Sequence, residues 1–250
     1  MRFQSFKKLI ILLFLGIFFS NDNALTIGDN NRQIGLFKPF IIGTPEIEIS
    51  THPLLFLIKP NFKIKKYLGK RHNLDFAGRF GFDYPSLLLK TLEREGTGGV
   101  LSIDETIDPI PHLFILSSEL LLTKKIAALQ ITNKIGLSLC PGCDLDSRNI
   151  IDLPIIYPRM KLYDSKILSN IGFDIEYFIS EKIKINTDLD FLIIPKEDTF
   201  IEHKLLFNYF LSKKISFTTG YKLAYGKYPY GKYLDLFPLL DITFYWTDKK

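Results

Sequence analysis

Hydrophobic and polar residues alternate at every second position over most of the chain after residue 45. Between residues 183 and 193 the odd-numbered positions are mostly apolar, whereas the even-numbered ones include Lys184, Asn186, Asp188 and Asp190. Successive side chains of a strand point to opposite faces, so this pattern predicts a strand with one apolar and one polar face. It does not have the 3.6-residue period of an amphipathic helix.

The same alternation predicts ten strands, most of them ten to thirteen residues long. They cover Glu46–Thr51, Asn61–Leu68, His72–Tyr84, His112–Leu122, Ile126–Leu139, Ile167–Ile179, Ile183–Ile193, Phe200–Leu211, Ile215–Tyr225 and Asp235–Trp246. Soluble strands are commonly about five or six residues long, whereas a tilted strand needs about 9–11 residues to cross a bilayer. Gln33–Ile41 and Leu153–Tyr163 are further candidates, and counting both gives twelve strands.

The predicted connections differ in length from one end of the strands to the other. Short turns are expected at Gly69-Lys70-Arg71, Lys124-Lys125, Glu181-Lys182 and Lys213-Lys214, and long loops at Pro85–Pro111 and Cys140–Lys166. Short periplasmic turns and longer outer loops are typical of outer-membrane barrels, and an even strand number closes the sheet without an edge. We therefore predict an all-β fold, a closed antiparallel transmembrane β-barrel of about ten strands, with twelve as the alternative.

The first residues have the pattern of an export signal. Arg2, Lys7 and Lys8 precede the apolar run Leu9–Phe19, which is too short to span a membrane as a helix, and Ala24 is a plausible cleavage site. We expect residues 1–24 to be a signal peptide, residues 25–44 a lead-in or an extra strand, and residues 45–250 the barrel.

Composition and charge exclude further classes of protein. Residues 1–24 carry three positive charges and one negative, so the net charge of +5 falls to +3 without them. This mild charge, with no basic cluster, gives no reason to expect a nucleic-acid partner. No apolar run after residue 24 approaches 18 residues, which excludes a membrane protein built from helices.

The polar face of the predicted strands carries charges of both signs in similar numbers. In a membrane barrel they would line the lumen, and in a soluble sandwich they would face solvent. The predicted lumen residues are Asp75, Arg79, Glu119, Lys134, Asp174, Glu176, Lys184, Asp188, Asp190, Glu202, Lys204, Lys222 and Asp241. Four of the acids could bind calcium, but a wall of ion pairs with the lysines is the favoured interpretation, and no metal or cofactor is predicted.

Tyrosines gather near the C-terminal end of the chain, in the stretch GYKLAYGKYPYGKY from residue 220 to 233. Tyrosine and tryptophan rings prefer the headgroup level of a membrane. We expect simple rim anchoring rather than a sugar-binding patch. The predicted rim aromatics are Tyr225, Tyr228, Tyr230, Tyr233, Tyr245 and Trp246.

Several short stretches carry a resemblance to known sequences. They are THPLL (51–55), PNFKIK (60–65), GTGG (96–99), LPIIYPR (153–159) and GYKLAYGKYPYG (220–231). Together they resemble a group of uncharacterised, predicted outer-membrane β-barrel proteins of Gram-negative-type bacteria. The resemblance spans most of residues 33 to 246 and implies fold and location, but no activity.

The sequence contains no clear catalytic motif. Outer-membrane acyl hydrolases pair a histidine with a serine, but His112 lies six residues before Ser118, and the run around His203 has no serine before Ser212. Ser86–Gly96 reads as a short helix with Ser86 as a possible N-cap. We predict no catalytic residue.

The favoured function is that of an integral outer-membrane barrel with a structural role or a narrow passage for small solutes, reached by export through the periplasm. Its expected partner is outer-membrane lipid. An outer-membrane lipid-modifying enzyme and a soluble exported β-sandwich binding protein are the alternatives.

The two cysteines, Cys140 and Cys143, form the motif CPGC. Nothing nearby completes a zinc site or a thioredoxin-like unit, and cysteines of exported proteins usually pair. We predict a disulfide between them that insertion does not require. Thiol labelling should rise after reduction, and equal labelling with and without reductant would contradict the pairing.

Overall fold

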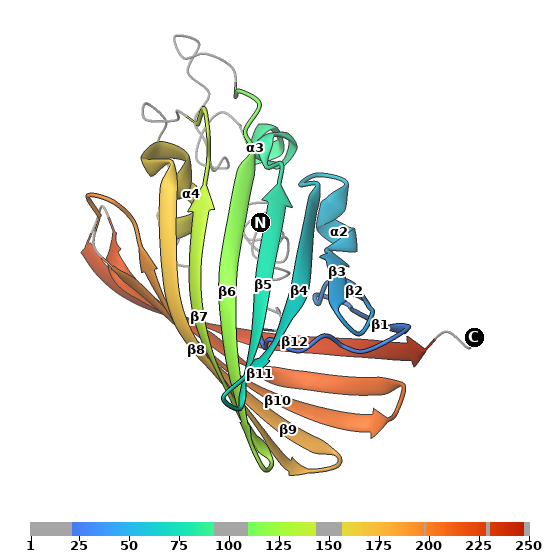
Figure 1. Cartoon of the computed structure of the whole chain (residues 1–250). Helices are drawn as coiled ribbons and strands as arrows, with labels where there is room; N and C mark the ends of the chain where they lie inside the picture. Colours follow the sequence, from blue (N-terminus) through green and yellow to red (C-terminus); the bar gives the residue numbers. More distant parts are fainter. Residues whose placement is uncertain (1–21, 93–109, 144–156, 198, 229–230, 248–250) are drawn as a thin grey trace, which may run out of the picture.

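The strands of the protein form one closed, antiparallel barrel (Figure 1). The computed structural model describes residues 22–92, 110–143, 157–197, 199–228 and 231–247. Each strand pairs with its neighbours in sequence, and β1 pairs with β12 to close the sheet. The fold class is therefore confirmed, with twelve strands rather than ten.

Strand lengths differ around the barrel. The elements are β1 (Asn31–Gly35), β2 (Phe40–Gly43), β3 (Ile47–Thr51), α2 (Pro53–Phe56), β4 (Asn61–Arg71), β5 (Leu74–Asp83), α3 (Ser86–Leu92), β6 (Ile115–Ile126), β7 (Leu129–Leu139), α4 (Tyr157–Ser165), β8 (Ile167–Ser180), β9 (Ile183–Ile193), β10 (Phe200–Ser212), β11 (Ile215–Tyr228) and β12 (Gly231–Thr247). The first three strands have four or five residues each, whereas β11 and β12 have 14 and 17. The wall is thus low on one side.

The two strands beyond ten come from the N-terminal part of the chain. The candidate Gln33–Ile41 divides into β1 and β2, because the chain leaves the sheet between Gly35 and Phe40. The other candidate, Leu153–Tyr163, is wrong where the structure describes it, since Tyr157–Ser165 is a helix. A β-sandwich is also wrong, because the strands form one closed sheet and not two stacked ones.

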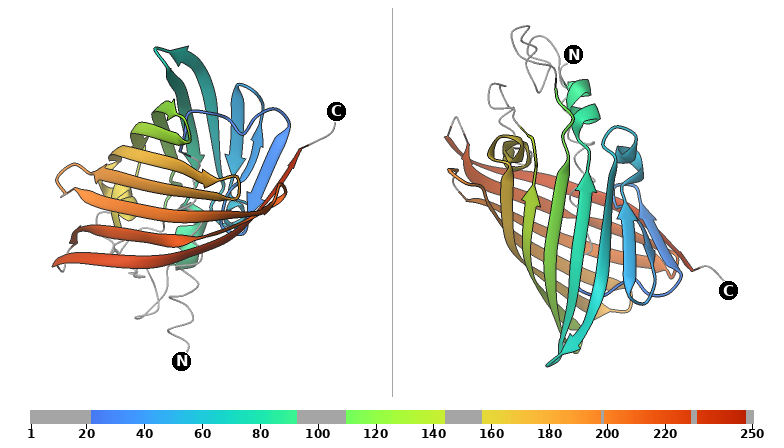
Figure 2. Two further views of the ribbon diagram at one scale, coloured as in Figure 1. Left: turned by 90° about the horizontal axis from the view of Figure 1, so that it is seen from below. Right: turned by 45° about the horizontal axis from the view of Figure 1, so that its top comes forward.

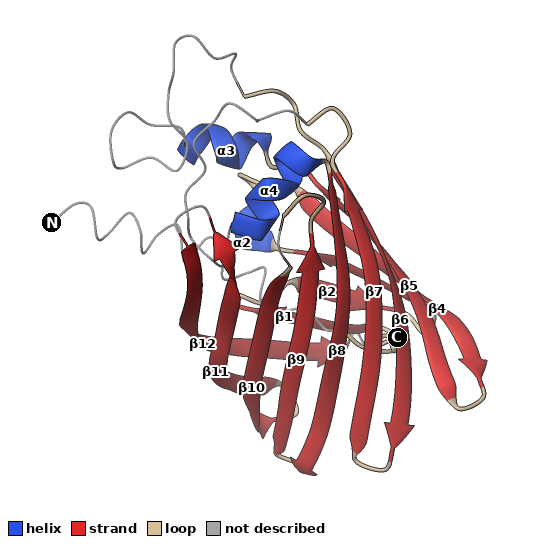
Figure 3. Ribbon diagram, turned by 90° about the vertical axis from the view of Figure 1, so that its left-hand side faces the viewer, coloured by secondary structure: helices blue, strands red, loops and turns tan. Residues whose placement is uncertain are grey.

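Short turns and helices lie at opposite ends of the barrel (Figures 1 and 3). The turn between β4 and β5 is at His72 and Asn73, both with positive φ, a few residues beyond the predicted position. The turn between β6 and β7 is at Ala127 and not at the predicted lysine pair, which remains in β6. All three helices lie in the longer connections at the other end.

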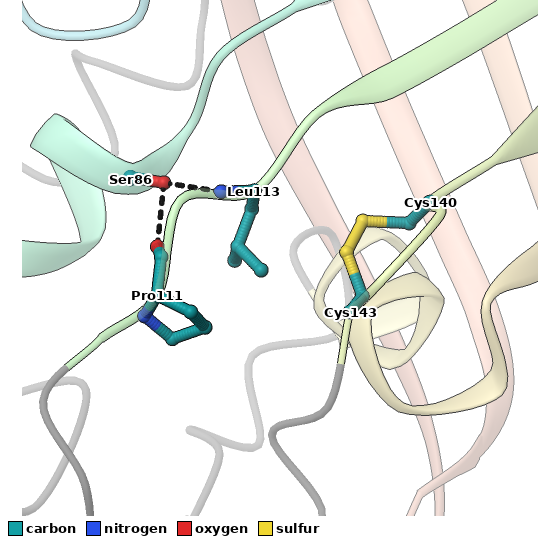
Figure 4. The surroundings of a disulfide bond; sticks show 5 residues. All are labelled: Ser86, Pro111, Leu113, Cys140 and Cys143. Carbon is teal, nitrogen blue, oxygen red and sulfur yellow. Dashed lines mark hydrogen bonds between the residues drawn. A yellow bond between two sulfur atoms is a disulfide. The ribbon is translucent and has the colours of Figure 1, made fainter.

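Helix α3 confirms the start of the helix predicted at Ser86, and the predicted end at Gly96 lies outside the described residues. The Ser86 hydroxyl donates to the carbonyl of Pro111 at 2.8 Å and accepts from the amide of Leu113 at 2.7 Å (Figure 4). This buried side chain therefore ties the helix to the segment before β6.

The outer surface of the barrel is apolar. Large apolar side chains that are more than a third exposed occur on every strand from β2 to β12, and on β9 the one exposed to this degree is Ile193 at its end. They include Ile42, Ile49, Ile64, Phe80, Leu120, Ile135, Ile171, Phe173, Phe207, Phe217, Leu240 and Phe244. A soluble monomer rarely exposes a contiguous apolar patch larger than a few hundred Å².

The long strand β12 extends well past its partner β1. The amide of Leu36 donates to the carbonyl of Ile242, so the even-numbered residues of β12 direct their backbone groups toward β1. Among the described strands, none pairs with this edge between Gly231 and Leu240. Pro238 is an even-numbered residue of this segment, so the N–H that proline lacks would have pointed to the unpaired edge.

A lysine on the apolar surface tests the orientation of the strands. Ile135 lies near the middle of β7 and is 55% exposed, whereas Ile126 lies at the end of β6 and is 49% exposed. We expect Ile135→Lys to destabilise the lipid-inserted barrel by roughly 2–4 kcal/mol, and Ile126→Lys by about 0–1 kcal/mol, because the cost falls toward the interface. Denaturant unfolding in lipid vesicles measures both, and equal effects would contradict a membrane-spanning β7.

Candidate functional site: the barrel lumen

The inner face of the barrel carries buried charges, as the alternation of residues predicts. Among these charged residues, those with less than a tenth of their surface exposed include Asp75, Lys134, Asp174, Glu176, Asp188, Glu202, Lys204, Lys222 and Asp241. Arg79 also contributes an inward, mostly buried guanidinium. Charges taken from water need partners, so their pairing decides what the lumen can do.

Lys134 of β7 is the centre of the largest group of ion pairs. Its Nζ lies 2.5 Å from an oxygen of Asp188 and 2.9 Å from an oxygen of Asp190. Lys204 of β10 reaches the other oxygen of Asp188 at 2.9 Å. These ion pairs thus run along the inner wall, from β7 past β8 to β9 and on to its neighbour β10.

A second group lies beside it on β5 and β6. Arg79 contacts Glu119 through Nε at 2.5 Å and also through its Nη2 atom. The two residues are direct register partners of these strands, so pairing alone brings them together. A forked guanidinium bound to one carboxylate fixes both side chains.

The third group joins a helix to the wall. Arg159 of α4 donates to both oxygens of Glu202, at 2.5 and 2.7 Å, and Lys222 of β11 donates to one of them at 2.7 Å. This contact holds α4 in the mouth of the barrel.

The other predicted lumen residues have separate partners. Lys184 lies 3.1 Å from Glu176. Asp75 accepts from the Tyr67 hydroxyl at 2.8 Å, and Asp241 accepts from the amide of Phe37 at 2.8 Å. The structure therefore gives most of the predicted charges a polar or charged partner on the inner face.

The N-terminal segment before β1 lies within this charged interior. Asp22 is 4% exposed, and its carboxylate lies 2.9 Å from Arg79, 3.6 Å from Lys134 and 3.9 Å from Lys204. Seen from below, the dark blue segment that precedes β1 runs across the barrel opening (Figure 2).

Carboxylate oxygens of Asp22, Asp174 and Asp188 lie within 4.8 Å of one another. Such a group has the oxygen ligands that calcium prefers. Here the ammonium groups of Lys134 and Lys204 already contact the carboxylate of Asp188. Asp22 and Asp188 therefore have cations beside them, whereas among the described residues one buried oxygen of Asp174 has no hydrogen-bond partner.

Sequence reasoning missed several of the lumen charges. Glu48 and Lys65 are register partners on β3 and β4 and form an ion pair of 3.0 Å. The alternation of lysines with apolar residues in 61–66 could have identified Lys65. Arg159 is on a helix that the strand pattern does not predict, and Asp22 falls within the expected signal peptide.

The upper part of the lumen is apolar. Leu88 and Leu89 of α3 and Met160 and Leu162 of α4 are buried in one cluster with inward residues of the strands. A cavity of about 210 Å³ lies between these helices and the charges around Arg79 and Lys134 below. The helices thus lie over a small chamber with an apolar top and a charged floor.

Tyr163 and His52 lie in the connections at this end. Burial raises the pKa of the Tyr163 phenol on α4 well above its ordinary value. Burial lowers the pKa of His52 below its ordinary value of 6.5. The neutral His52 ring fits its contacts, since Nε2 lies 2.8 Å from the carbonyl of Phe37 and Nδ1 accepts from the amide of Leu55.

The predicted rim aromatics occupy different surroundings. Tyr225 and Trp246 are partly exposed, at 38% and 36%, and the Trp246 ring stacks on Phe40. Tyr233 is 43% exposed at the other end of β12 from Trp246. Tyr230 lies outside the described residues.

Two of these tyrosines face inward instead. Tyr228 is only 3% exposed and packs against Tyr157 and Phe200, so its assignment to the rim is wrong. Tyr245 directs its hydroxyl to Ser216, 3.0 Å away, on the inner side of the short-turn end. The alternation of faces explains the inward direction of both tyrosines. Tyr228 lies on the same face of β11 as the buried Ser216, and Ser216 is the residue that Tyr245 of β12 contacts.

Cys140 and Cys143 are joined through their sulfur atoms directly after β7 (Figure 4). Both are fully buried, and the amide of Cys140 donates to the carbonyl of Lys166 at 2.9 Å. Labelling of these thiols therefore has to follow denaturation of the protein.

The histidines of the catalytic alternative have other partners. His112 contacts the Tyr84 hydroxyl through Nδ1, and Nε2 of His203 lies 3.0 Å from the Thr187 hydroxyl. Among the hydrogen bonds of the described histidines, none goes to a serine.

Comparisons with known proteins identify no sequence family. No family model matches the chain, and no curated protein matches it. A solved structure of OmpT (in-vitro folded), an outer membrane protein of Vibrio cholerae, is similar with 8% identity and a TM-score of 0.40. The match covers 86% of this chain and 64% of that one. The fold assignment rests on the strand pairing and not on this likeness.

None of the helices in the described ranges is long and apolar enough to cross a membrane.

Removal of Lys134 tests the ion pairs of the lumen. Lys134→Met leaves Asp188 and Asp190 without this buried cation, and breaking a buried pair from one side typically costs about 3–5 kcal/mol. Lys161→Met is the control, because its pairs with Asp164 and Glu197 are partly exposed and worth roughly 0–1 kcal/mol. Denaturant unfolding in vesicles should separate the two, and equal midpoints would contradict a structural role for the Lys134 group.

Proposed function

We propose that the protein is an integral outer-membrane β-barrel whose interior is packed, so that it serves as a structural barrel or passes only small solutes. The observation that carries this proposal is the inverted surface: apolar side chains face outward around a closed sheet, and paired charges face inward. In water this arrangement would expose the apolar side and bury the charged one at a cost. In lipid it removes the apolar surface from water.

The direction of the barrel follows from its connections. Both ends of the sheet, at Asn31 and Thr247, lie at the end with the short turns, as an even strand number requires. Short turns belong to the periplasmic side of outer-membrane barrels. Helices α2, α3 and α4 are then on the outer side.

The packed lumen argues for a small or closed passage. The carboxylate of Asp22 lies among cations of β5, β7 and β10 in the lower part, and α3 and α4 bury apolar side chains in the upper part. Barrels of about eight strands are filled by side chains and those of 16 to 18 enclose a water-filled channel, so for twelve strands the contacts inside the lumen decide. The cavity of about 210 Å³ leaves room for a few water molecules or one small solute.

Cell fractionation and conductance test this proposal. We expect the protein in the outer-membrane fraction, released only by detergent, with a gel mobility that changes on heating. In planar bilayers its conductance should be far below that of an open porin measured in parallel. Recovery in the soluble periplasmic fraction would overturn the membrane assignment, and porin-like conductance would overturn the packed lumen.

A further inference from the structure

Residues Asp22–Leu25 are bound inside the lumen by side chains from six strands of the barrel wall. The amide of Ala24 donates to the Thr123 hydroxyl of β6 at 2.8 Å, and Ala24 is fully buried. Lys65 of β4 donates to the carbonyls of Asn23 and Leu25, at 3.2 and 2.7 Å. These are contacts to the backbone as well as to side chains, so the segment is held in one register.

Side chains of the same segment complete the contacts. The Asn23 amide donates to Glu176 of β8 at 3.2 Å. The Asp22 carboxylate lies among Arg79, Lys134 and Lys204, which come from β5, β7 and β10. These four consecutive residues thus contact β4, β5, β6, β7, β8 and β10.

The barrel interior is matched to this segment. Without Asp22, the group of Arg79, Lys134 and Lys204 would lose a buried carboxylate. Without Asn23 and Leu25, the Lys65 ammonium, 2% exposed, would retain its ion pair with Glu48 but lose two carbonyl acceptors. Buried polar groups left without partners cost roughly 1–3 kcal/mol each, and more when charged.

We infer that residues Asp22–Leu25 stay on the mature chain after export and act as a tethered plug of the lumen. This inference rests on the proposed membrane function. It moves the end of the signal peptide from Ala24 to a position before Asp22. Ser20 is the last small residue in that part of the sequence, and small residues are preferred at the cleavage site.

The mass of the intact protein purified from outer membranes tests where processing occurs. We expect a mature chain that begins at or before Asp22. A chain that begins at Asn23 or later would overturn the inference. Such a result would leave the membrane assignment untouched, because fractionation tests that separately.

Conductance tests whether the segment is a plug. Asp22→Lys places a cation among Arg79, Lys134 and Lys204, so we expect it to expel the segment and to raise the conductance above that of the unaltered protein. Asp29→Lys makes the same change of charge at an exposed position and should leave the conductance unchanged.

A milder variant covers the case in which Asp22→Lys does not fold. Asp22→Asn keeps the size of the side chain and removes its charge, and it should increase the frequency of opening events. If both Asp22 variants fold and have the conductance of the unaltered protein, the plug is overturned. An equal rise in the conductance of Asp29→Lys would overturn it as well. Heat-modifiable gel mobility shows which variants are folded.

Discussion

Closure of the backbone hydrogen-bond ladder is the constraint on which the rest of this structure depends. In the hydrocarbon of a membrane no water is present to satisfy N–H and C=O groups, so a sheet has to close on itself. The antiparallel pairing of β1 with β12 achieves this closure through only the short segment Asn31–Gly35. Once the sheet is closed, every strand has one face toward the lipid and one toward the interior.

The interior then has to accept the polar face of every strand in a confined space. Charges of opposite sign solve this problem locally, because register partners such as Glu48 with Lys65 and Arg79 with Glu119 already face each other across adjacent strands. Lys134 of β7 reaches past β8 to Asp188 of β9, so ion pairs also join strands that are not adjacent. The segment at Asp22 takes part in the same kind of pairing, since its carboxylate and backbone carbonyls contact cations of the wall.

Much of this arrangement could be predicted from the sequence, because a period of two residues specifies a face for each side chain. The assignment of Asp188, Lys204 and Lys222 to the interior needs nothing beyond that period. The candidate strand at Gln33–Ile41 is in fact β1 and β2, of five and four residues, and the alternation within it is too brief to show where the chain leaves the sheet between them. Face and depth are also different properties: Tyr228 lies at the end of its strand, but its inward direction buries it beneath α4. Arg159 and Asp22 enter the lumen from outside the strands, and no local pattern specifies such contacts.

The position of Pro238 affects how this barrel behaves among its neighbours in a crowded membrane. A free strand edge is a template on which the strand of another molecule can add hydrogen bonds. Strand β12 has such an edge between Gly231 and Leu240, where no described strand pairs with it on the β1 side. Proline offers no donor at the middle of that edge, and its ring occupies the space that an incoming strand would need. The ladder between two copies would therefore be interrupted after a few residues on either side. The barrel can keep an incompletely paired strand and still resist fusing with its neighbours into a continuous sheet.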